Sequence, residues 1–464
     1  MSGDDRTTPA APGLTPQIVN DLEAAAEASP LDATLQITLA AAYETTGDRV
    51  KAAAARLAAL ALTERNAIAL YNIATAYMNQ ALLGEAERWY RVALAVNPEL
   101  AIAHQNLASL LRERGETRAA AEHLKRAYTL QAVYVEQGNA HAPRVLVACA
   151  GGIGNVPVKY LMPERHYTQI RYFVDYVSDR DLAALPAHDV VFNAIGDPDV
   201  IDSDDVRLNA LIAQTNRTVL NPPGRVARTR RDHLPALLAG IEGARVPSAR
   251  RIEPGPAGTL SPTTIADSLA QSGPPYPVIL RPLASHGGQG MTLAHDRADV
   301  ECPAPTHPDA LQTPPAHADA VYATAFHDYR SADGYFRKYR MIFVDREPYP
   351  YHLAISDHWL VHYFSADMTE TSWKLEEERR FLANPEAALG PRAYATLRAI
   401  AYRIDLDYAG IDFSLMPNGD VIVFEANATM LVHPEPANSP LAHKNVQVQT
   451  IVDAFARMIH KAVS

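Results

Sequence analysis

The first third of the chain repeats itself with a period of 34 residues. Segments that start at Ala33, Ala67 and Ala101 align without a gap and fill residues 33–134. In every copy alanine stands at the eighth, twentieth and twenty-seventh positions, and leucine or isoleucine at the seventh. Small residues at fixed positions let two helices touch, so each copy is expected to be a helix pair that buries its faces against its neighbours.

This pattern resembles the tetratricopeptide repeat. The middle copy matches best because it ends in Asn97-Pro98. Gly47 and Gly115 share the fifteenth position, where the first helix of a copy is expected to end in a left-handed residue, and the middle copy has Ala81 there. The resemblance implies an all-α solenoid whose groove binds a peptide or protein partner or mediates self-association.

Composition limits the classes of function. Lys and Arg number 42 against 53 Asp and Glu, a net charge of −11, which argues against general binding to nucleic acid or to anionic membranes. The chain has no signal-peptide pattern and no apolar run of about 20 residues, so a cytoplasmic protein is expected. Cys149 and Cys302 are too few and too far apart for a disulfide framework or a cysteine zinc site, and both are expected to be buried and inert.

One predicted hairpin near the C-terminus concentrates carboxylates. Asn418-Gly419 between two alternating apolar runs predicts a two-residue turn, which places Asp412 directly across from Glu425, with Asn427 on the same face. The opposite face is expected to be apolar and to face the core, and consists of Ile411, Phe413, Leu415, Ile422, Phe424 and Ala426. Two facing carboxylates need compensation, so the pair is either a divalent-metal site or an edge hairpin that faces solvent beside an arginine.

Two glycine-rich segments follow buried strands. Residues 277–282 are expected to form a strand that carries Arg281, and the glycines of 284–291 follow it. Glycines let backbone N–H groups converge on phosphate oxygens, so this segment is either a glycine hairpin or a phosphate clamp. Residues 151–154, after a predicted strand at 144–150, are likewise open between a structural turn and a ligand contact.

Taken in order, these features resemble the ATP-grasp superfamily. The resemblance rests on the strand with its cation and glycines, a later strand at 339–345, and the Gly-Ile-Asp and Glu-Ala-Asn segments of the hairpin. It covers about residues 144–440 and is similar to the glutathione synthetase and ribosomal-protein-modifying ligase branch. The implied activity is ATP-dependent carboxylate–amine ligation: a carboxylate takes the γ-phosphoryl group, ADP leaves, and an amine displaces phosphate to form an amide.

The resemblance also implies the fold and the domain organisation. The chain is expected to be multidomain, with an all-α tetratricopeptide-repeat solenoid, an α/β pre-ATP-grasp domain and an α+β ATP-grasp domain. The expected parts are a disordered tail (1–15), the repeat domain (16–135, with repeats 33–66, 67–100 and 101–134), the pre-ATP-grasp domain (144–225) and the ATP-grasp domain (226–464).

By position, the resemblance assigns roles to individual residues. Asp412, Glu425 and Asn427 would hold one or two Mg²⁺ ions, with Mn²⁺ as an alternative. Arg281 would contact the nucleotide phosphates, and Arg340 would stabilise the transferring phosphoryl group. The other implied ATP contacts are Ser285, His286, Gly287, Gly288, Gln289, Gly290 and His233.

Three positions depart from the family pattern. Arg281 stands where a lysine is usual, and either Arg231 or His233 must replace a second lysine. Ala325 occupies the place of a glutamate that often marks the adenine hinge.

No motif names the substrates, which are expected to be a small-molecule or peptide carboxylate and an amine. Loops 365–380 and 430–444 are the expected specificity segments. The candidate substrate contacts are Lys374, His352 and His433. Two other functions stay open: a kinase that phosphorylates a hydroxyl with the same metal clamp, and a non-catalytic repeat adaptor that binds nucleotide. A homo-oligomer also fits the pattern.

Overall fold

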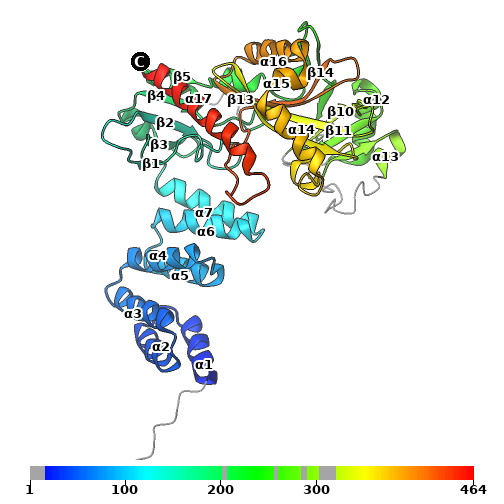
Figure 1. Cartoon of the computed structure of the whole chain (residues 1–464). Coiled ribbons are helices and arrows are strands. Elements are labelled where there is room, and N and C mark those ends of the chain that lie inside the picture. The colour runs from blue at the N-terminus through cyan, green and yellow to red at the C-terminus, as the bar shows by residue number, and fades with distance from the viewer. Residues whose placement is uncertain (1–15, 201–205, 255–259, 284–289, 303–319) are drawn as a thin grey trace, which may run out of the picture. The chain divides into compact units, whose positions relative to one another are not determined.

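The structure is a computed structural model that describes residues 16–200, 206–254, 260–283, 290–302 and 320–464. The chain divides into two compact units, Met1–Val133 and Tyr134–Ser464, which we call the repeat unit and the C-terminal unit (Figure 1). A helical region is followed by mixed α/β structure, as predicted. The tail predicted at 1–15 lies outside the described residues.

The repeat unit consists of α1 followed by helix pairs that each begin at the first residue of a 34-residue segment. The helices are α1 (Pro16–Ala28), α2 (Ala33–Thr46), α3 (Arg49–Thr63), α4 (Ala67–Asn79), α5 (Leu83–Val96), α6 (Ala101–Glu113) and α7 (Thr117–Leu130). Asp32, Asp48 and Asn66 cap α2, α3 and α4 because their side chains accept hydrogen bonds from backbone N–H groups of the first turn. All nine recurrent alanines are buried, with exposed fractions of 5% or less. The repeated alanines are therefore the contact surfaces between helices.

The turn inside each helix pair has the predicted left-handed residue. Gly47 and Gly115 have φ of +86° and +79°, and Ala81 takes φ of +58° at the same position of the middle copy. An alanine in this region is strained, at a cost on the order of 1–2 kcal/mol. The repeat thus preserves the backbone conformation of the turn even where glycine is absent.

The described residues of the C-terminal unit form three sheets. The first has the order β1-β3-β2-β4-β5, with β2 to β5 parallel, and comprises β1 (Val133–Glu136), β2 (Arg144–Cys149), β3 (Thr168–Phe173), β4 (Val190–Asn193) and β5 (Val219–Leu220). The second is antiparallel in the order β7-β10-β8-β9, from β7 (Ala249–Ile252), β8 (Val278–Pro282), β9 (Thr292–Ala294) and β10 (Val321–Ala325). The third has the order β12-β11-β13-β14-β6, from β6 (Ala244–Arg245), β11 (Phe336–Val344), β12 (Glu347–Ser356), β13 (Tyr408–Leu415) and β14 (Val421–Asn427).

Helices join and cover these sheets. They are α8 (Asp179–Ala183), α9 (Val206–Gln214), α10 (Pro223–Ala227), α11 (Leu234–Leu237), α12 (Pro262–Ser272), α13 (Arg297–Glu301), α14 (Ser372–Ala383), α15 (Pro385–Leu389), α16 (Pro391–Ile404) and α17 (Asn445–Val463). Phe455 of α17 packs against Phe192 of β4 and Tyr408 of β13, with ring centroids 5.4 and 5.7 Å apart, so α17 joins the first and third sheets. No helix within the described residues has the length and apolar character needed to cross a membrane.

A buried asparagine also joins the first sheet to the third. Asn221 follows β5 with φ of +52°. Its side-chain amide donates to the Tyr408 carbonyl oxygen and accepts from the backbone N–H groups of Asp407 and Tyr408, at 2.8–2.9 Å. Its own backbone N–H donates to the Asp407 carboxylate at 2.7 Å. One side chain therefore takes the place of a strand partner at the start of β13.

The hairpin of β13 and β14 pairs Asp412 with Glu425, as predicted, but its loop and its register differ from the prediction. The two-residue turn is wrong: the backbone N–H of Met416 donates to the carbonyl oxygen of Asp420, and Gly419 takes φ of +81° inside a three-residue loop. A register shift next to Asp412, typical of a β-bulge, then restores the predicted pairing.

The two cysteines differ. Cys149 is buried at the end of β2, and burial raises the pKa of its thiol to about 12. Cys302, which follows α13, is exposed, so the prediction that both are buried is wrong for this residue. The reason is its place after a five-residue helix outside the strands of the sheet.

Candidate functional site

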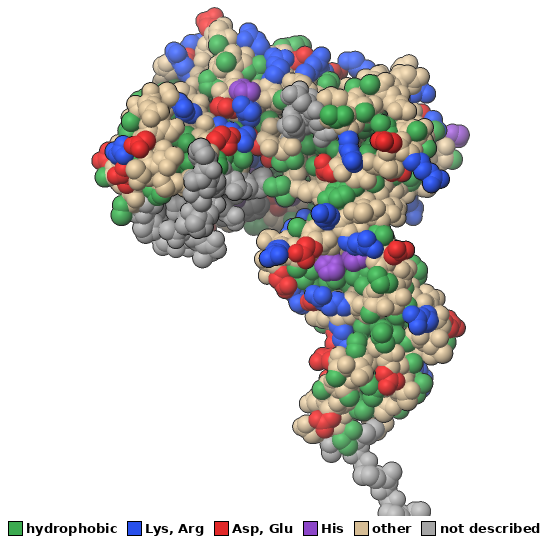
Figure 2. All heavy atoms as spheres, turned by 180° about the vertical axis from the view of Figure 1, so that it is seen from behind, with side chains coloured by type: hydrophobic (Ala, Val, Ile, Leu, Met, Phe, Trp, Pro, Cys, Tyr) green, Lys and Arg blue, Asp and Glu red, His purple; other side chains and the backbone are tan. Residues whose placement is uncertain are grey.

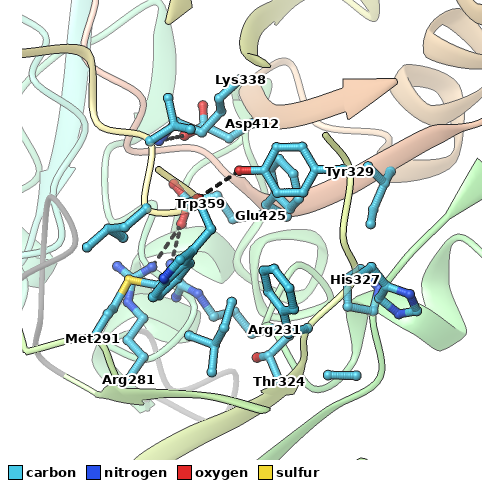
Figure 3. A pocket seen from close by; sticks show the side chains of 18 of the residues that line it. Arg231, Arg281, Met291, Thr324, His327, Tyr329, Lys338, Trp359, Asp412 and Glu425 are labelled. Atoms are coloured by element: carbon cyan, nitrogen blue, oxygen red, sulfur yellow. Dashed lines mark hydrogen bonds and ion pairs between the residues drawn. The ribbon is translucent and has the colours of Figure 1, made fainter. Parts of the chain in front are cut away.

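A cavity of about 200 Å³ lies between the second and third sheets (Figure 3). Its walls come from β8 and β10 of the second sheet and from β11, β13 and β14 of the third. The rest of the lining consists of Phe326, His327, Tyr329, residues 359–362, Arg231, Pro247 and Met291. Strands far apart in the sequence thus face one another across a single small space.

Charged side chains of both signs line this cavity. Among the described residues they are four cationic and two carboxylate side chains, namely Arg231, Arg281, Lys338, Arg340, Asp412 and Glu425. The lining therefore carries an excess of two positive charges, which favours an anionic ligand.

Asp412 on β13 binds two cations of β11. Nε and Nη2 of Arg340 donate to the two carboxylate oxygens at 2.6 and 2.9 Å, and Nζ of Lys338 lies 3.4 Å from Oδ2. Burial alone would raise the pKa of Asp412, but the charges and hydrogen bonds of Arg340 and Lys338 hold that pKa well below its usual range. Asp412 is therefore ionised although only 3% of its surface is exposed.

Glu425 on β14 binds two further arginines. Arg231 forms a hydrogen-bonded ion pair with Oε2, and Nη1 of Arg281 lies 3.4 Å from the same oxygen. Burial acts to raise the pKa of Glu425, but the charges of Arg231 and Arg281 outweigh it and lower the pKa. Burial and the neighbouring charge of Arg231 lower the pKa of Arg281 itself. The two arginines converge on one carboxylate, as the close-up of the cavity shows (Figure 3).

Strand register explains how the sequence builds this arrangement. His352, Arg340, Asp412 and Glu425 pair in turn across β12, β11, β13 and β14. Paired residues of neighbouring strands project on the same face. The charged groups thus form one row across the third sheet.

The rest of the lining is aromatic and apolar. Phe326 and Trp359 meet edge to face with ring centroids 6.0 Å apart, and Tyr329 packs on Phe424 at 4.8 Å. The hydroxyl of Tyr329 donates to the Trp359 carbonyl oxygen at 2.9 Å. Phe424 was predicted on the core face, but the bulge in the hairpin brings it into the same cavity as Glu425. A flat apolar group therefore fits beside the charged row.

Asp199 connects the first sheet to the arginines of the cavity. It follows β4, accepts a hydrogen bond of 2.5 Å from the Tyr322 hydroxyl, and lies 3.4 Å from Arg251 and 3.9 Å from Arg231. Burial raises the pKa of Asp199, while its bond to Tyr322 and the two arginines oppose this effect. Asp199 and Glu425 thus hold Arg231 from two sides.

The residues present fit a hard divalent cation only together with a ligand that adds oxygens. Among the described residues, no three His, Cys, Asp or Glu side chains are arranged to hold a metal ion. Asp412 and Glu425, however, are two ionised carboxylates that face each other in one cavity. Mg²⁺ is commonly bound by one or two carboxylates plus substrate phosphates. The chemistry of this donor pair suits that mode of binding.

Some of the residues predicted to bind metal or phosphate line the cavity, and one does not. Arg281, Arg340, Asp412 and Glu425 all line the cavity. Asn427 does not, because its Oδ1 accepts hydrogen bonds from the backbone N–H and the hydroxyl of Thr429 at 2.9 and 3.0 Å.

His233 is not among the residues that line the cavity. Its Nε2 lies 2.7 Å from Nη2 of Arg230, and it directly precedes α11. Arg231, the alternative that the sequence left open, reaches the cavity instead. Ser285, His286, Gly287, Gly288 and Gln289 lie outside the described residues, and Gly290 has φ of +68°.

The candidate substrate residues lie outside the cavity lining. Lys374 is buried in α14 and its Nζ donates to the Ala366 carbonyl oxygen at 2.8 Å. His352 is buried and stacks on Tyr363 with ring centroids 4.7 Å apart. His433 is partly exposed, and its backbone N–H donates to the Tyr351 hydroxyl at 3.3 Å.

Sequence reasoning missed several residues of the cavity. Lys338 stands two residues before Arg340, so strand periodicity could have placed it on the same face. Tyr329, Trp359 and His362 come from irregular segments, for which the sequence carries no comparable signal. Burial, Lys338 and Arg340 together lower the pKa of His362.

No protein-family model matches the chain, and no curated protein matches it. Among solved structures it is similar to D-alanine–D-alanine ligase from Bacillus anthracis complexed with ATP, at 12% identity over 69% of this chain and 97% of that chain, with a TM-score of 0.40. It is also similar to a RimK domain protein ATP-grasp from Sphaerobacter thermophilus, at 17% identity over 67% and 98%, with a TM-score of 0.35. MamA matches at 19% identity over 25% and 67%, with a TM-score of 0.17. All three TM-scores are below 0.5, so we base the function on the residues of the cavity.

Proposed function

We propose that the C-terminal unit is an ATP-grasp ligase that joins a carboxylate to an amine at the expense of ATP. The observation that carries the proposal is the cavity in which four cations and two ionised carboxylates meet an aromatic compartment between the second and third sheets. The order of motifs that resembles the ATP-grasp superfamily supports the same assignment. The domains at 144–225 and 226–464 are proposed accordingly.

The charge of the cavity suits a metal-bound nucleoside triphosphate. Its side chains carry an excess of two positive charges. ATP carries about four negative charges at neutral pH, and one Mg²⁺ reduces this to about two. The complex would therefore neutralise the cavity, with the base against Phe326, Trp359 and Tyr329 and the phosphates against the charged row.

Five of the six charged side chains named above are then assigned to three tasks. Arg231 and Arg281 would bind phosphate oxygens, while Asp412 and Glu425 would hold Mg²⁺, which would supply charge neutralisation at the phosphates. Arg340, fixed in place by Asp412, donates its N–H groups to the transferring phosphoryl group. Asn427 and residues 285–290 are proposed as further ligands by resemblance.

The reaction proceeds in two transfers. A carboxylate oxygen of the acid bonds to the γ-phosphorus while the bond to the ADP oxygen breaks. The amine nitrogen then bonds to the acyl carbon, phosphate leaves with the electron pair of the C–O bond, and the nitrogen loses a proton to solvent. The partly apolar lining of the cavity would limit the access of water to the acyl phosphate.

The repeat unit is proposed to act as an interaction module for a peptide or protein. The substrates of the ligase are proposed to be a small-molecule or peptide carboxylate and an amine. Lys374, His352 and His433 lie outside the cavity lining, which favours positioning over direct substrate contact for these residues.

The test is release of ADP and phosphate from ATP with Mg²⁺ and pools of carboxylates and amines, followed by subtraction of single compounds. Turnover should require both an acid and an amine, and Glu425→Ala should reduce it at least a hundredfold. Glu164→Ala, at an exposed acid outside the cavity, is the matched control. Release of AMP would contradict the acyl-phosphate route. A phosphorylated product without any amine would indicate a kinase, and nucleotide binding without turnover an adaptor.

A further inference from the structure

One histidine of the cavity has no task in the proposed reaction. The chain has 17 histidines, and some of them lie on the molecular surface, as Figure 2 shows for one face. Among the described residues, only His327 and His362 line the cavity. The ring of His327 points away from Glu425 and its arginines (Figure 3). The surroundings of His362 are different.

His362 lies among charged groups of three neighbouring strands. The groups whose charges act on its imidazole are Lys338 and Arg340 of β11, Asp412 of β13 and His352 of β12. Arg340 is proposed above to stabilise the transferring phosphoryl group, and Asp412 to hold Mg²⁺. His362 is therefore close to the place where the acyl phosphate would form.

The backbone fixes the direction of the His362 side chain. This residue is extended, with φ of −122° and ψ of 136°, so its side chain and the next one point to opposite sides. The next side chain, Tyr363, is buried, and its hydroxyl donates to the Glu378 carboxylate at 3.1 Å. Three residues before His362, the Trp359 carbonyl oxygen accepts a hydrogen bond of 2.9 Å from Tyr329. The segment is thus held on both sides of His362, whose ring faces the cavity that it lines.

The imidazole of His362 is neutral at pH 7 and can accept a proton. Burial, together with the charges of Lys338 and Arg340, lowers its pKa below the ordinary 6.5. A bound nucleotide and a bound acid add negative charge that offsets these two cations, which makes the imidazolium easier to form. The ring is partly exposed, so a proton that it takes up can pass to water.

We propose that His362 is the general base of the amine step, an inference that rests on the proposed ligase function. The amine nitrogen bonds to the acyl carbon, and phosphate leaves with the electron pair of the C–O bond. A ring nitrogen of His362 takes the proton that the amine nitrogen must lose, which leaves a neutral amide, and the imidazolium then releases this proton to solvent. General bases typically contribute about 10²–10⁴-fold to a rate.

Hydroxylamine separates this role from phosphoryl transfer. It attacks acyl phosphates without the help of a base, and the hydroxamate that forms reports on the first transfer alone. Wild type and His362→Gln are each given ATP, Mg²⁺ and a mixture of N-acetyl amino acids, with either a mixture of amino-acid amides or hydroxylamine as the acceptor. In the variant, amide formation should fall at least about a hundredfold, while hydroxamate formation should stay within about threefold of the wild type.

The variant must also be intact in other respects. Its thermal unfolding and its affinity for ADP should match those of the wild type. His358→Gln is the matched control, because His358 lies in the same segment but outside the cavity lining. Glutamine can accept the hydrogen bond of 3.2 Å that Nδ1 of His358 accepts from the backbone N–H of Leu360. The control should form both products at wild-type rates.

The two products distinguish the ways in which the inference can fail. Equal losses of hydroxamate and amide in His362→Gln would overturn it, because the residue would then act before the amine step. Unchanged amide formation would overturn it as well. A wild type that forms no hydroxamate and releases no ADP would contradict the ligase function itself, and the role of His362 would fall with it.

Discussion

The two units of this protein fill their interiors in opposite ways. In the repeat unit the contacts between helices are made by the recurrent alanines together with larger apolar and aromatic side chains, none of which needs a counter-charge. In the C-terminal unit the third sheet buries a row of charged groups, each of which needs a counter-charge. The stability of the first interior depends on how well its side chains fill the available volume, and that of the second on how well its charges are paired. The two should therefore respond to different kinds of substitution.

The largest effect is expected from breaking a buried ion pair. Asp412→Ala leaves Arg340 and Lys338 without their carboxylate in a site that water barely reaches. Removal of one partner of a buried pair typically costs about 3–5 kcal/mol. Urea unfolding should show a decrease of this size in the free energy of unfolding of the C-terminal unit.

The same site offers a control. The double variant Arg340→Met/Asp412→Leu replaces both charges by apolar groups, and such replacements are often neutral. It should recover the part of the stability that Asp412→Ala loses at Arg340, while Lys338 still lacks its carboxylate, and it should remain inactive. Equal destabilisation of the single and double variants would mean that the unpaired charge of Arg340 is not the cause of the lost stability.

A medium effect is expected from adding volume to the repeat unit. Ala40 on α2 is 2% exposed, and Ala40→Leu forces extra methylene groups between packed helices, at a cost of about 1–3 kcal/mol. The next residue of the same helix, Ala41, is exposed, so Ala41→Leu should change the free energy of unfolding by less than about 0.5 kcal/mol. Similar values for the two variants in thermal unfolding would contradict the volume argument.

The smallest effect concerns pH. Burial, with the charges of Arg340 and Lys444, lowers the pKa of His352 well below its ordinary 6.5. The imidazole, stacked on Tyr363, is therefore neutral in the folded protein and takes up a proton on unfolding below pH 6.5. Its contribution to stability is complete above that pH and is lost as the pH falls, by at most about 1.4 kcal/mol per pH unit.

His352→Phe keeps an aromatic ring and removes the titration. The free energy of unfolding should then fall less steeply between pH 6.5 and 5 than it does in the wild type. His166→Phe, at an exposed position, should leave the slope unchanged. An unaltered slope in His352→Phe would show that other groups dominate this range.

Local patterns predicted much of this structure. The period of 34 located the helix pairs because small residues must recur wherever helices touch. Alternation predicted that Asp412 and Glu425 share a face, and they do pair, although the loop at Asn418-Gly419 has three residues and a bulge restores the register. Both signals act over short stretches of chain, where periodicity and turn chemistry decide the outcome.

The remaining features depend on contacts between distant segments. The sequence does not show that Arg231, rather than His233, meets Glu425, since 194 residues separate this pair. Nor does it show the bulge that moves Phe424 into the cavity. The order of the sheets and the aromatic wall at 326–329 and 359–362 likewise arise only when the strands assemble.

The asparagine between the first and third sheets has a consequence for motion. Asn221 makes four buried hydrogen bonds to Asp407 and Tyr408. A hinge between these two sheets would expose or strand all four, at about 1–3 kcal/mol for each unsatisfied group. A hinge between these two sheets therefore carries that cost, whereas rotation of the second sheet would leave the four bonds intact and break the contacts of Asp199 with Tyr322 and Arg251 and of Arg281 with Glu425.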